Sequence, residues 1–230
     1  MWAIIKKEVK SYFLSPIAYV FIGLFLLVCS GCFYLYIFMS NGYADFEYMF
    51  GNIISMFVLM IIVSVLTMRM FAEERRNGTE QLLYTSPRSI TSIVLGKFIA
   101  ACIVMLVCEL LTLGYLGIIS YFGKPDIGMA IISIVGVFLL TITYIAYGMF
   151  ISSITENQII AAVLTFVGLI ILFFMPEFND KFLDFSPINA FGNSFLQGMV
   201  TYQSLTLFLS FTIMFIILTI IVIQRRKSVK

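Results

Sequence analysis

The stretch that decides the fold runs from Ile53 to Arg88 and reads IISMFVLMIIVSVLTM followed by RMFAEERRNGTEQLLYTSPR. Its first part, up to Met68, carries no charge, whereas charged residues crowd the part that begins at Arg69. A long uncharged apolar run is typical of a helix in a lipid bilayer, and charged side chains are costly in hydrocarbon. The stretch therefore predicts a membrane-spanning helix that leads directly into a soluble loop. We expect this loop to be the surface on which a partner docks.

The composition of the whole chain points to the same class. Hydrophobic residues make up 61% of the 230 residues and charged residues 11%, and the mean hydropathy is +1.06. Soluble domains are roughly half apolar and a quarter charged. Because unpaired backbone groups are costly in lipid, only helices and closed barrels cross a membrane, and the apolar runs here are too long for barrel strands. We predict an all-α membrane protein with a single transmembrane domain over residues 1–230.

The apolar runs define six transmembrane helices. A hydrocarbon core of about 30 Å needs about twenty apolar residues per helix. The predicted spans are residues 17–39, 53–68, 93–120, 127–152, 159–175 and 205–223. The segment 176–204 is too polar to span and too rich in Phe, Leu and Met to hang free in water. It predicts an external re-entrant or interfacial segment with one or two short helices near the turns at Ser186 and Phe191.

The basic residues are unevenly distributed among the loops. Twelve of the fourteen Lys and Arg residues precede the first span, bracket the loop after the second, or follow the sixth. The other two are Lys124 and Lys181, in loops that also carry acidic residues. By the positive-inside rule, both termini are cytoplasmic in a multi-pass protein of the cell membrane. The net charge of +2 says nothing about nucleic acid. Because no basic patch with stacking aromatics lies outside the membrane zone, we expect membrane lipid and no nucleic acid among the partners.

The first fifteen residues form an amphipathic pattern. One face, about a third of a helical wheel, is apolar; the face consists of Trp2, Ile5, Val9, Tyr12 and Phe13, and the lysines Lys6, Lys7 and Lys10 fall on the other side. This pattern predicts an interfacial helix over residues 1–15 that lies on the inner leaflet. The alternative is a Lys-rich flank that only sets the topology of the first span.

Local sequence signals predict a short helix inside the charged loop, which covers residues 73–90. Asn77 is followed three residues later by Glu80, a pair that resembles a capping box, and Pro87 ends the helix because it restricts the residue before it. One side of this helix presents an apolar knob for a groove on a soluble partner; the knob consists of Thr79, Leu82 and Leu83. Closer to the membrane, opposite charges three or four residues apart can pair along a continuing helix. The alternative is a solvated loop whose arginines only enforce topology.

Glu109 is the one ionisable residue deep inside a predicted span. Its charged form costs about 2.5 to 3.5 kcal/mol there, so the side chain is not expected to face lipid. One interpretation places it in a substrate or gating cavity. The other has it neutral, or hydrogen-bonded to a Thr, Ser or Tyr of an adjacent helix. The four cysteines all fall inside predicted spans, and in a chain without histidine they are expected to be packing residues rather than metal ligands; they are Cys29, Cys32, Cys102 and Cys108.

The charged loop, with Glu73 to Leu83, then Ser86-Pro87 and Leu95-Gly96-Lys97, closely resembles the loop between spans two and three of ABC-2 type (type V) ABC transporter permeases. It is most similar to the branch that includes the gliding-motility and nitrous-oxide-reductase maturation permeases. The resemblance covers the whole chain. Three further pieces agree with that branch: Lys7-Glu8 with Ser15-Pro16-Ile17, Thr155-Glu156-Asn157-Gln158, and Ser186-Pro187 with Gly198.

The resemblance implies roles for several segments. Residues 1–15 would be the elbow helix, and the charged loop would hold the coupling helix that sits on a nucleotide-binding subunit. The expected ATPase-coupling residues are Glu73, Glu74, Arg75, Arg76, Gly78, Thr79, Glu80, Leu82, Leu83, Pro87, Glu156 and Asn157. The last two form a second, smaller contact. Segment 176–204 would contain the family's external gate helices, or, as the alternative, a lid over the fifth and sixth spans.

The resemblance also implies partners. A separate ABC ATPase subunit would bind ATP and Mg²⁺, because this chain lacks the Gly-x-x-x-x-Gly-Lys-[Ser/Thr] loop that holds phosphates and binds no cofactor itself. A second permease subunit, identical or not, would complete the transporter. We expect a bacterial exporter that works by alternating access. The alternatives are an ATP-independent secondary transporter or channel, and a non-transporting membrane anchor for a cytoplasmic protein. The substrate is not encoded in any motif of the chain.

Overall fold

The computed structural model describes residues 1–39, 48–79, 89–122, 126–178 and 185–229. Every regular element in these segments is a helix, as the composition predicts. Six of the helices are long and apolar enough to cross a membrane. They are α2 (Pro16–Met39), α4 (Ile53–Met68), α7 (Ile90–Phe122), α8 (Ile127–Ile154), α9 (Gln158–Phe178) and α11 (Tyr202–Val229). The prediction of six long apolar helices is confirmed by these candidate spans, and α4 has the predicted bounds.

Several spans are longer than the apolar runs indicate. Helix α7 has 33 residues, a length of about 50 Å at the rise of an α-helix. It therefore extends well beyond a hydrocarbon core of about 30 Å. Helix α9 continues past Met175, where the predicted span stops, through Pro176 to Phe178. Helix α11 likewise continues beyond Ile223 into the charged residues near the C-terminus.

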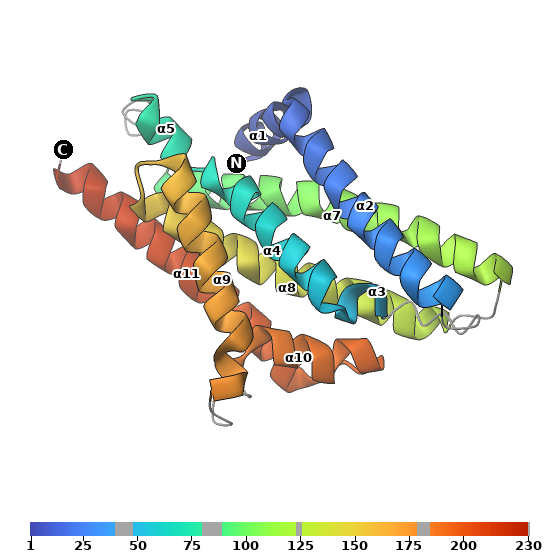
Figure 1. Cartoon of the computed structure of the whole chain (residues 1–230). Helices are drawn as coiled ribbons and strands as arrows, with labels where there is room; N and C mark the ends of the chain where they lie inside the picture. Colours follow the sequence, from blue (N-terminus) through green and yellow to red (C-terminus); the bar gives the residue numbers. More distant parts are fainter. Residues whose placement is uncertain (40–47, 80–88, 123–125, 179–184, 230) are drawn as a thin grey trace.

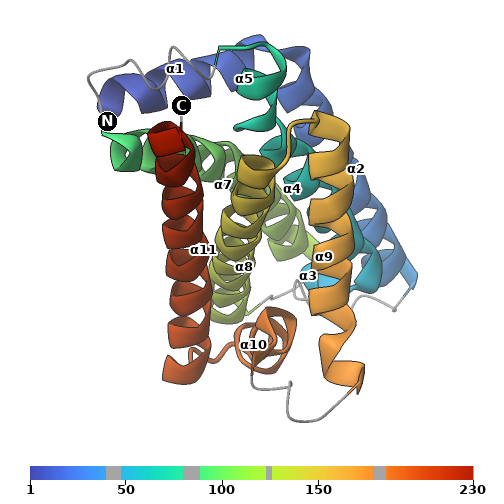
Figure 2. The same ribbon diagram turned by 90° about the vertical axis from the view of Figure 1, so that its left-hand side faces the viewer.

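Helix α8 occupies the centre of the bundle. It packs against α4, α7, α9 and α11, and in Figure 2 it lies between α11 and α4. Small residues let its neighbours approach closely. A side chain at Gly136 would collide with Phe195, and one at Gly148 would collide with Thr67. The buried polar residues of α8, such as Ser133 and Thr141, bond to carbonyls within reach, so the core tolerates them.

The two ends of the bundle carry different short elements. At one end lie α1 (Trp2–Leu14), α5 (Ala72–Arg76) and both chain termini (Figure 2). Helix α1 crosses this end and meets α2 at Ser15, whose extended backbone and following Pro16 separate the two helices. At the other end lies α10 (Pro187–Asn193), followed by a 3-10 turn, η2 (Phe195–Gln197) (Figure 1). A further short helix, α3 (Tyr48–Gly51), precedes α4.

The charged loop does not begin as predicted. Helix α5 ends at Arg76, and Asn77 is its C-cap, with helical backbone angles (φ −86°, ψ −1°). Gly78 follows with φ +70°, the left-handed conformation in which helices commonly end and which glycine adopts without strain. A residue that starts a helix has extended backbone angles instead, so the prediction that Asn77 caps a following helix is wrong. Residues 80–88, which were expected to form that helix, lie outside the described residues.

Candidate functional site: the junction of α1, α5 and α7

Helix α5 is attached to the central helix α8 at its first turn. The backbone N–H groups of Phe71 and Ala72 donate to Ser152 Oγ at 3.1 and 3.2 Å. Both residues are buried, and the first N–H groups of a helix have no partner within the helix. Ser152, itself buried on α8, supplies that partner. The hydroxyl therefore fixes where α5 starts relative to the bundle.

The charges around α5 form ion pairs. Arg69 Nε lies 2.9 Å from Glu73 Oε2, and a second nitrogen of Arg69 donates to Glu73 Oε1 at 3.1 Å. This confirms the predicted pairing of opposite charges in this segment. The prediction that they pair along a continuing helix is wrong, because α4 ends at Met68 and α5 begins only at Ala72. About a third of each side chain is exposed (28% and 33%), and such partly exposed pairs contribute little stability. Their effect is to hold the turn between α4 and α5 in one conformation.

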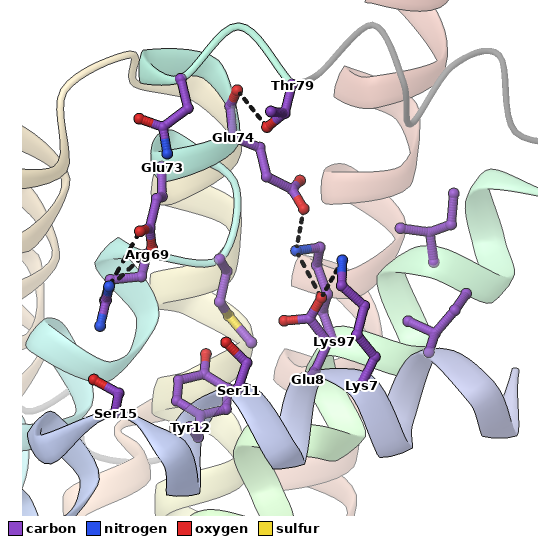
Figure 3. A pocket seen from close by; sticks show the side chains of 14 residues that line it. Lys7, Glu8, Ser11, Tyr12, Ser15, Arg69, Glu73, Glu74, Thr79 and Lys97 are labelled. Atoms are coloured by element: carbon purple, nitrogen blue, oxygen red, sulfur yellow. Dashed lines mark hydrogen bonds and ion pairs between the residues drawn. The ribbon is translucent and has the colours of Figure 1, made fainter.

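Lys97 of α7 joins α5 to α1. Its Nζ lies 2.7 Å from Glu74 Oε1 and 3.5 Å from Glu8 Oε1 (Figure 3). The ring of Phe71 lies 5.4 Å from the same nitrogen, within the range of a cation–π contact. Only 5% of the lysine side chain is exposed. A buried cation is stable only when it is paired, and here the two carboxylates come from different helices.

Close packing brings α1 onto α7 beside this lysine. A Cβ atom built at Gly96 would lie 2.8 Å from Ile4 Cγ2, closer than real Cβ atoms come, so only glycine fits beneath α1 without a shift. Three sequence pieces that are far apart in the chain thus meet at one place: Lys7-Glu8, Glu73-Glu74 and Gly96-Lys97. Lys97 was not among the predicted site residues. The sequence did contain a signal for this residue. Lys97 lies inside the apolar run that was predicted to span the membrane, and a cation in such a run needs a partner.

A cavity of about 600 Å³ opens between α1, α5 and the start of α7 (Figure 3). Its wall combines charged residues, hydroxyls and a few apolar side chains. It is lined by Ile4, Lys7, Glu8, Ser11, Tyr12, Ser15, Arg69, Met70, Glu73, Glu74, Asn77, Thr79, Ile93 and Lys97. Burial raises the pKa of the Tyr12 phenol, so its hydroxyl stays protonated, and it lies 3.5 Å from the carbonyl of Leu66 in α4.

Two arginines, Arg75 and Arg226, bind carbonyl groups at the C-terminal end of α8. Arg75 donates from Nη1 to the carbonyl of Thr155 at 2.8 Å and from Nη2 to the carbonyl of Ser153. Arg226 of α11 donates to the carbonyl of Ile154 at 2.9 Å. The last carbonyls of a helix lack partners within it and attract cations. The C-terminus of α8 is therefore tied to α5 on one side and to α11 on the other.

The family model described as ABC-2 family transporter protein matches residues 39–223. This region begins at the last residue of α2 and ends within α11, so it contains α4, α7, α8, α9 and most of α11, together with α5 and the charged loop. The chain belongs to the ABC-2 family of transporter proteins. It is a membrane permease domain, a transporter subunit that carries no catalytic activity, and membership implies partnership with an ABC ATPase. No curated protein matches the chain.

The predicted coupling residues of this permease occupy one end of the bundle where the structure describes them. Arg76 at the end of α5 and Gly78 and Thr79 after it are exposed. The Thr79 hydroxyl donates to the Glu74 carbonyl at 3.2 Å. Four of the predicted residues lie outside the described part of the chain: Glu80, Leu82, Leu83 and Pro87.

The predicted second contact lies beside the first. Glu156 and Asn157 are exposed in the connection between α8 and α9. Asn157 Oδ1 accepts a hydrogen bond from the backbone N–H of Ile159 at 2.9 Å and so supports the start of α9. Because Arg75 bonds to the carbonyl of Thr155, this connection is held next to α5. The structure thus brings the described members of both predicted contacts together.

Glu109 lies in the interior of the permease, away from this junction. Its side chain is buried, with 2% of the residue exposed, and its Oε1 lies 2.9 Å from the Thr141 hydroxyl of α8. The geometry agrees with the hydrogen-bonded interpretation of this residue. Glu109 is not among the residues that line the cavity described above. The four cysteines are buried and free, and within the described residues no cluster of three or more His, Cys, Asp or Glu side chains forms a metal site.

Proposed function

We propose that the permease receives movement from a separate ABC ATPase through α5 and the charged loop, and converts it into alternating access of a substrate pathway. The observation that carries this proposal is the attachment of α5 on both sides. Lys97 pairs it with α7, and Ser152 and Arg75 bind it to α8. A short segment attached to two spans in this way transmits a displacement to both of them.

The attached spans suit this role by their length and position. Helix α7 extends beyond the bilayer, by the length argument above, and α8 contacts most of the other spans. ATP binding by the partner would close its nucleotide sites and move two such loops toward each other in a permease dimer. Helices α7 and α8 would carry that movement into the membrane and shift the population from inward-open to outward-open. ATP and Mg²⁺ remain on the ATPase.

The charge pattern supports the orientation that this mechanism needs. The end of the bundle with α1, α5 and both termini holds the basic clusters that the positive-inside rule assigns to the cytoplasm. In this orientation α1 is the elbow helix and residues 73–90 form the coupling loop. The motifs quoted above favour a bacterial exporter of the gliding-motility or nitrous-oxide-reductase maturation branch. Family membership argues against the ATP-independent alternative.

The test is purification of the permease with its cognate ATPase and measurement of hydrolysis in liposomes. We expect the ATPase to co-purify and to hydrolyse ATP faster in the complex than alone. Glu73→Ala and Leu82→Asp should remove this acceleration while the permease still inserts in the membrane. Glu177→Ala is the matched control, because Glu177 is an exposed carboxylate near the other end of α9. Unchanged hydrolysis in both loop variants would refute the assigned role, and an ATPase that binds without any acceleration would indicate a membrane anchor.

A further inference from the structure

Lys97 is a buried cation shared by carboxylates of two different helices. Glu74 belongs to α5, and Glu8 belongs to α1. We propose that Lys97 is a positioning residue that makes α1 move together with α5, so that α1 is a moving part of the permease and not a passive anchor on the membrane surface. This inference rests on the proposed function, because the partner ATPase supplies the displacement of α5.

The distances show how the displacement would be passed on. The Glu74 contact of Lys97 is short, at 2.7 Å, and the Glu8 contact is longer, at 3.5 Å. Removing one partner of a buried ion pair leaves an uncompensated charge, which is strongly unfavourable. When α5 moves Glu74, the ammonium group must follow it or draw closer to Glu8. Either response changes the force on α1.

The other described cations near Lys97 do not connect α5 with α1. Arg69 is engaged with both oxygens of Glu73. Lys7 lies 3.9 Å from Glu8, but 76% of its side chain is exposed, so water screens that contact. Apolar packing of Ile4 over Gly96 keeps α1 against α7 and does not involve α5. Among the residues that the structure describes, the connection from α5 to α1 through charge therefore passes through Lys97.

The chain contains a natural reporter of α1. Trp2 is its single tryptophan, it lies in the first turn of α1, and 75% of it is exposed. Permease labelled with 5-fluorotryptophan and combined with unlabelled cognate ATPase in lipid nanodiscs gives one ¹⁹F resonance. Its position is compared without nucleotide and with Mg²⁺ and a non-hydrolysable ATP analogue. Hydrolysis of ATP is measured on the same samples.

We expect nucleotide to shift the Trp2 resonance in the wild-type complex. The shift should be lost in Lys97→Met, which removes the charge but keeps the length of the side chain, and in Glu8→Gln, which leaves the Glu74 contact intact. Lys10→Gln, an exposed change on the same helix, should behave as wild type. The triple variant Glu8→Lys, Glu74→Lys, Lys97→Glu changes the sign of all three charges. A single charge on α7 again lies between two opposite charges on α1 and α5, so the variant should restore the nucleotide-dependent shift of the Trp2 resonance.

The outcomes separate the two proposals. If the ATPase binds and hydrolyses ATP but the wild-type Trp2 resonance does not respond to nucleotide, α1 does not move and this inference fails while the proposed function stands. This inference also fails, and the proposed function stands, if nucleotide still shifts the Trp2 resonance in Glu8→Gln. That result is decisive even if the Lys97→Met variant does not assemble with the ATPase. If no ATPase binds the wild-type permease, the proposed function fails and this inference fails with it.

Discussion

At the scale of single residues, Glu109 shows how a carboxyl group is accommodated inside the bundle. Thr141 Oγ1 lies 2.8 Å from the carbonyl of Val137 and 2.9 Å from Glu109 Oε1. A hydroxyl has one proton to donate, so it cannot serve both acceptors at once. If Glu109 is protonated, it donates to Thr141, and Thr141 donates to Val137. The geometry therefore favours a neutral carboxylic acid that acts as a donor.

This argument predicts that Glu109→Gln is tolerated. The amide has nearly the same shape and can donate to Thr141 in place of the acid, so we expect the free energy of unfolding to change by less than about 1 kcal/mol. Glu109→Ala loses the hydrogen bond and leaves a cavity, and should cost about 1 to 3 kcal/mol. Thermal unfolding in detergent compares the variants. If Gln destabilises the permease as much as Ala does, the group is ionised in the folded protein. The wild type should also show the infrared carbonyl band of a protonated acid, absent in Glu109→Gln.

At the scale of helices, the packing of α1 against α7 depends on a glycine. The Cβ of any other residue at position 96 would lie 2.8 Å from Ile4 Cγ2 and 3.2 Å from Ile4 Cβ. Because the second of these atoms is close to the backbone, rotation of the isoleucine cannot make enough room. Helix α1 itself must shift. The packing of this helix is thus sensitive to a single methyl group.

We therefore predict that Gly96→Val displaces α1. Acrylamide should quench the fluorescence of Trp2 more strongly in this variant than in the wild type, because the helix that carries Trp2 is no longer held against α7. Gly114→Val is the matched control on the same helix, since nothing lies within 4 Å of a Cβ at that position. Adding Ile4→Ala to Gly96→Val should lessen the effect without abolishing it, because alanine removes the nearest atom, Cγ2, but keeps the Cβ that lies 3.2 Å away. Equal quenching in the two valine variants would contradict the proposed packing of α1 over Gly96.

The elements differ in how far the sequence predicts them. Long apolar runs are enough to locate the spans, because the bilayer imposes the length and the helical state. Lys97 and Ser152 act through partners far away in the chain, Glu8 and the amides at the start of α5, and no local pattern encodes those contacts. Asn77 was misassigned because asparagine is common both before and after helices. The backbone of Gly78 decides between the two.

At the scale of the whole molecule, the short elements divide the bundle into two unlike ends. One end combines α1, α5 and both termini, and the other carries α10 (Figure 2). The contacts of Arg75 and Lys97 lie at the first end, and η2 follows α10 at the second. All ten Lys and Arg residues within the described segments belong to the first end. An excess of Lys and Arg keeps short loops in the cytoplasm. The charge distribution, and not the fold alone, therefore predicts the orientation in the membrane.

The last prediction concerns this orientation. In intact cells, a membrane-impermeant maleimide should label Asn193→Cys, at the exposed end of α10, but not Lys227→Cys, near the end of α11, until the cells are permeabilised. The native cysteines provide little background because all four are buried. Labelling of Lys227→Cys in intact cells would show that the protein has the opposite orientation. It would also place α5 and the charged loop where no cytoplasmic ATPase can reach them, so this one measurement tests the geometric condition on which coupling depends.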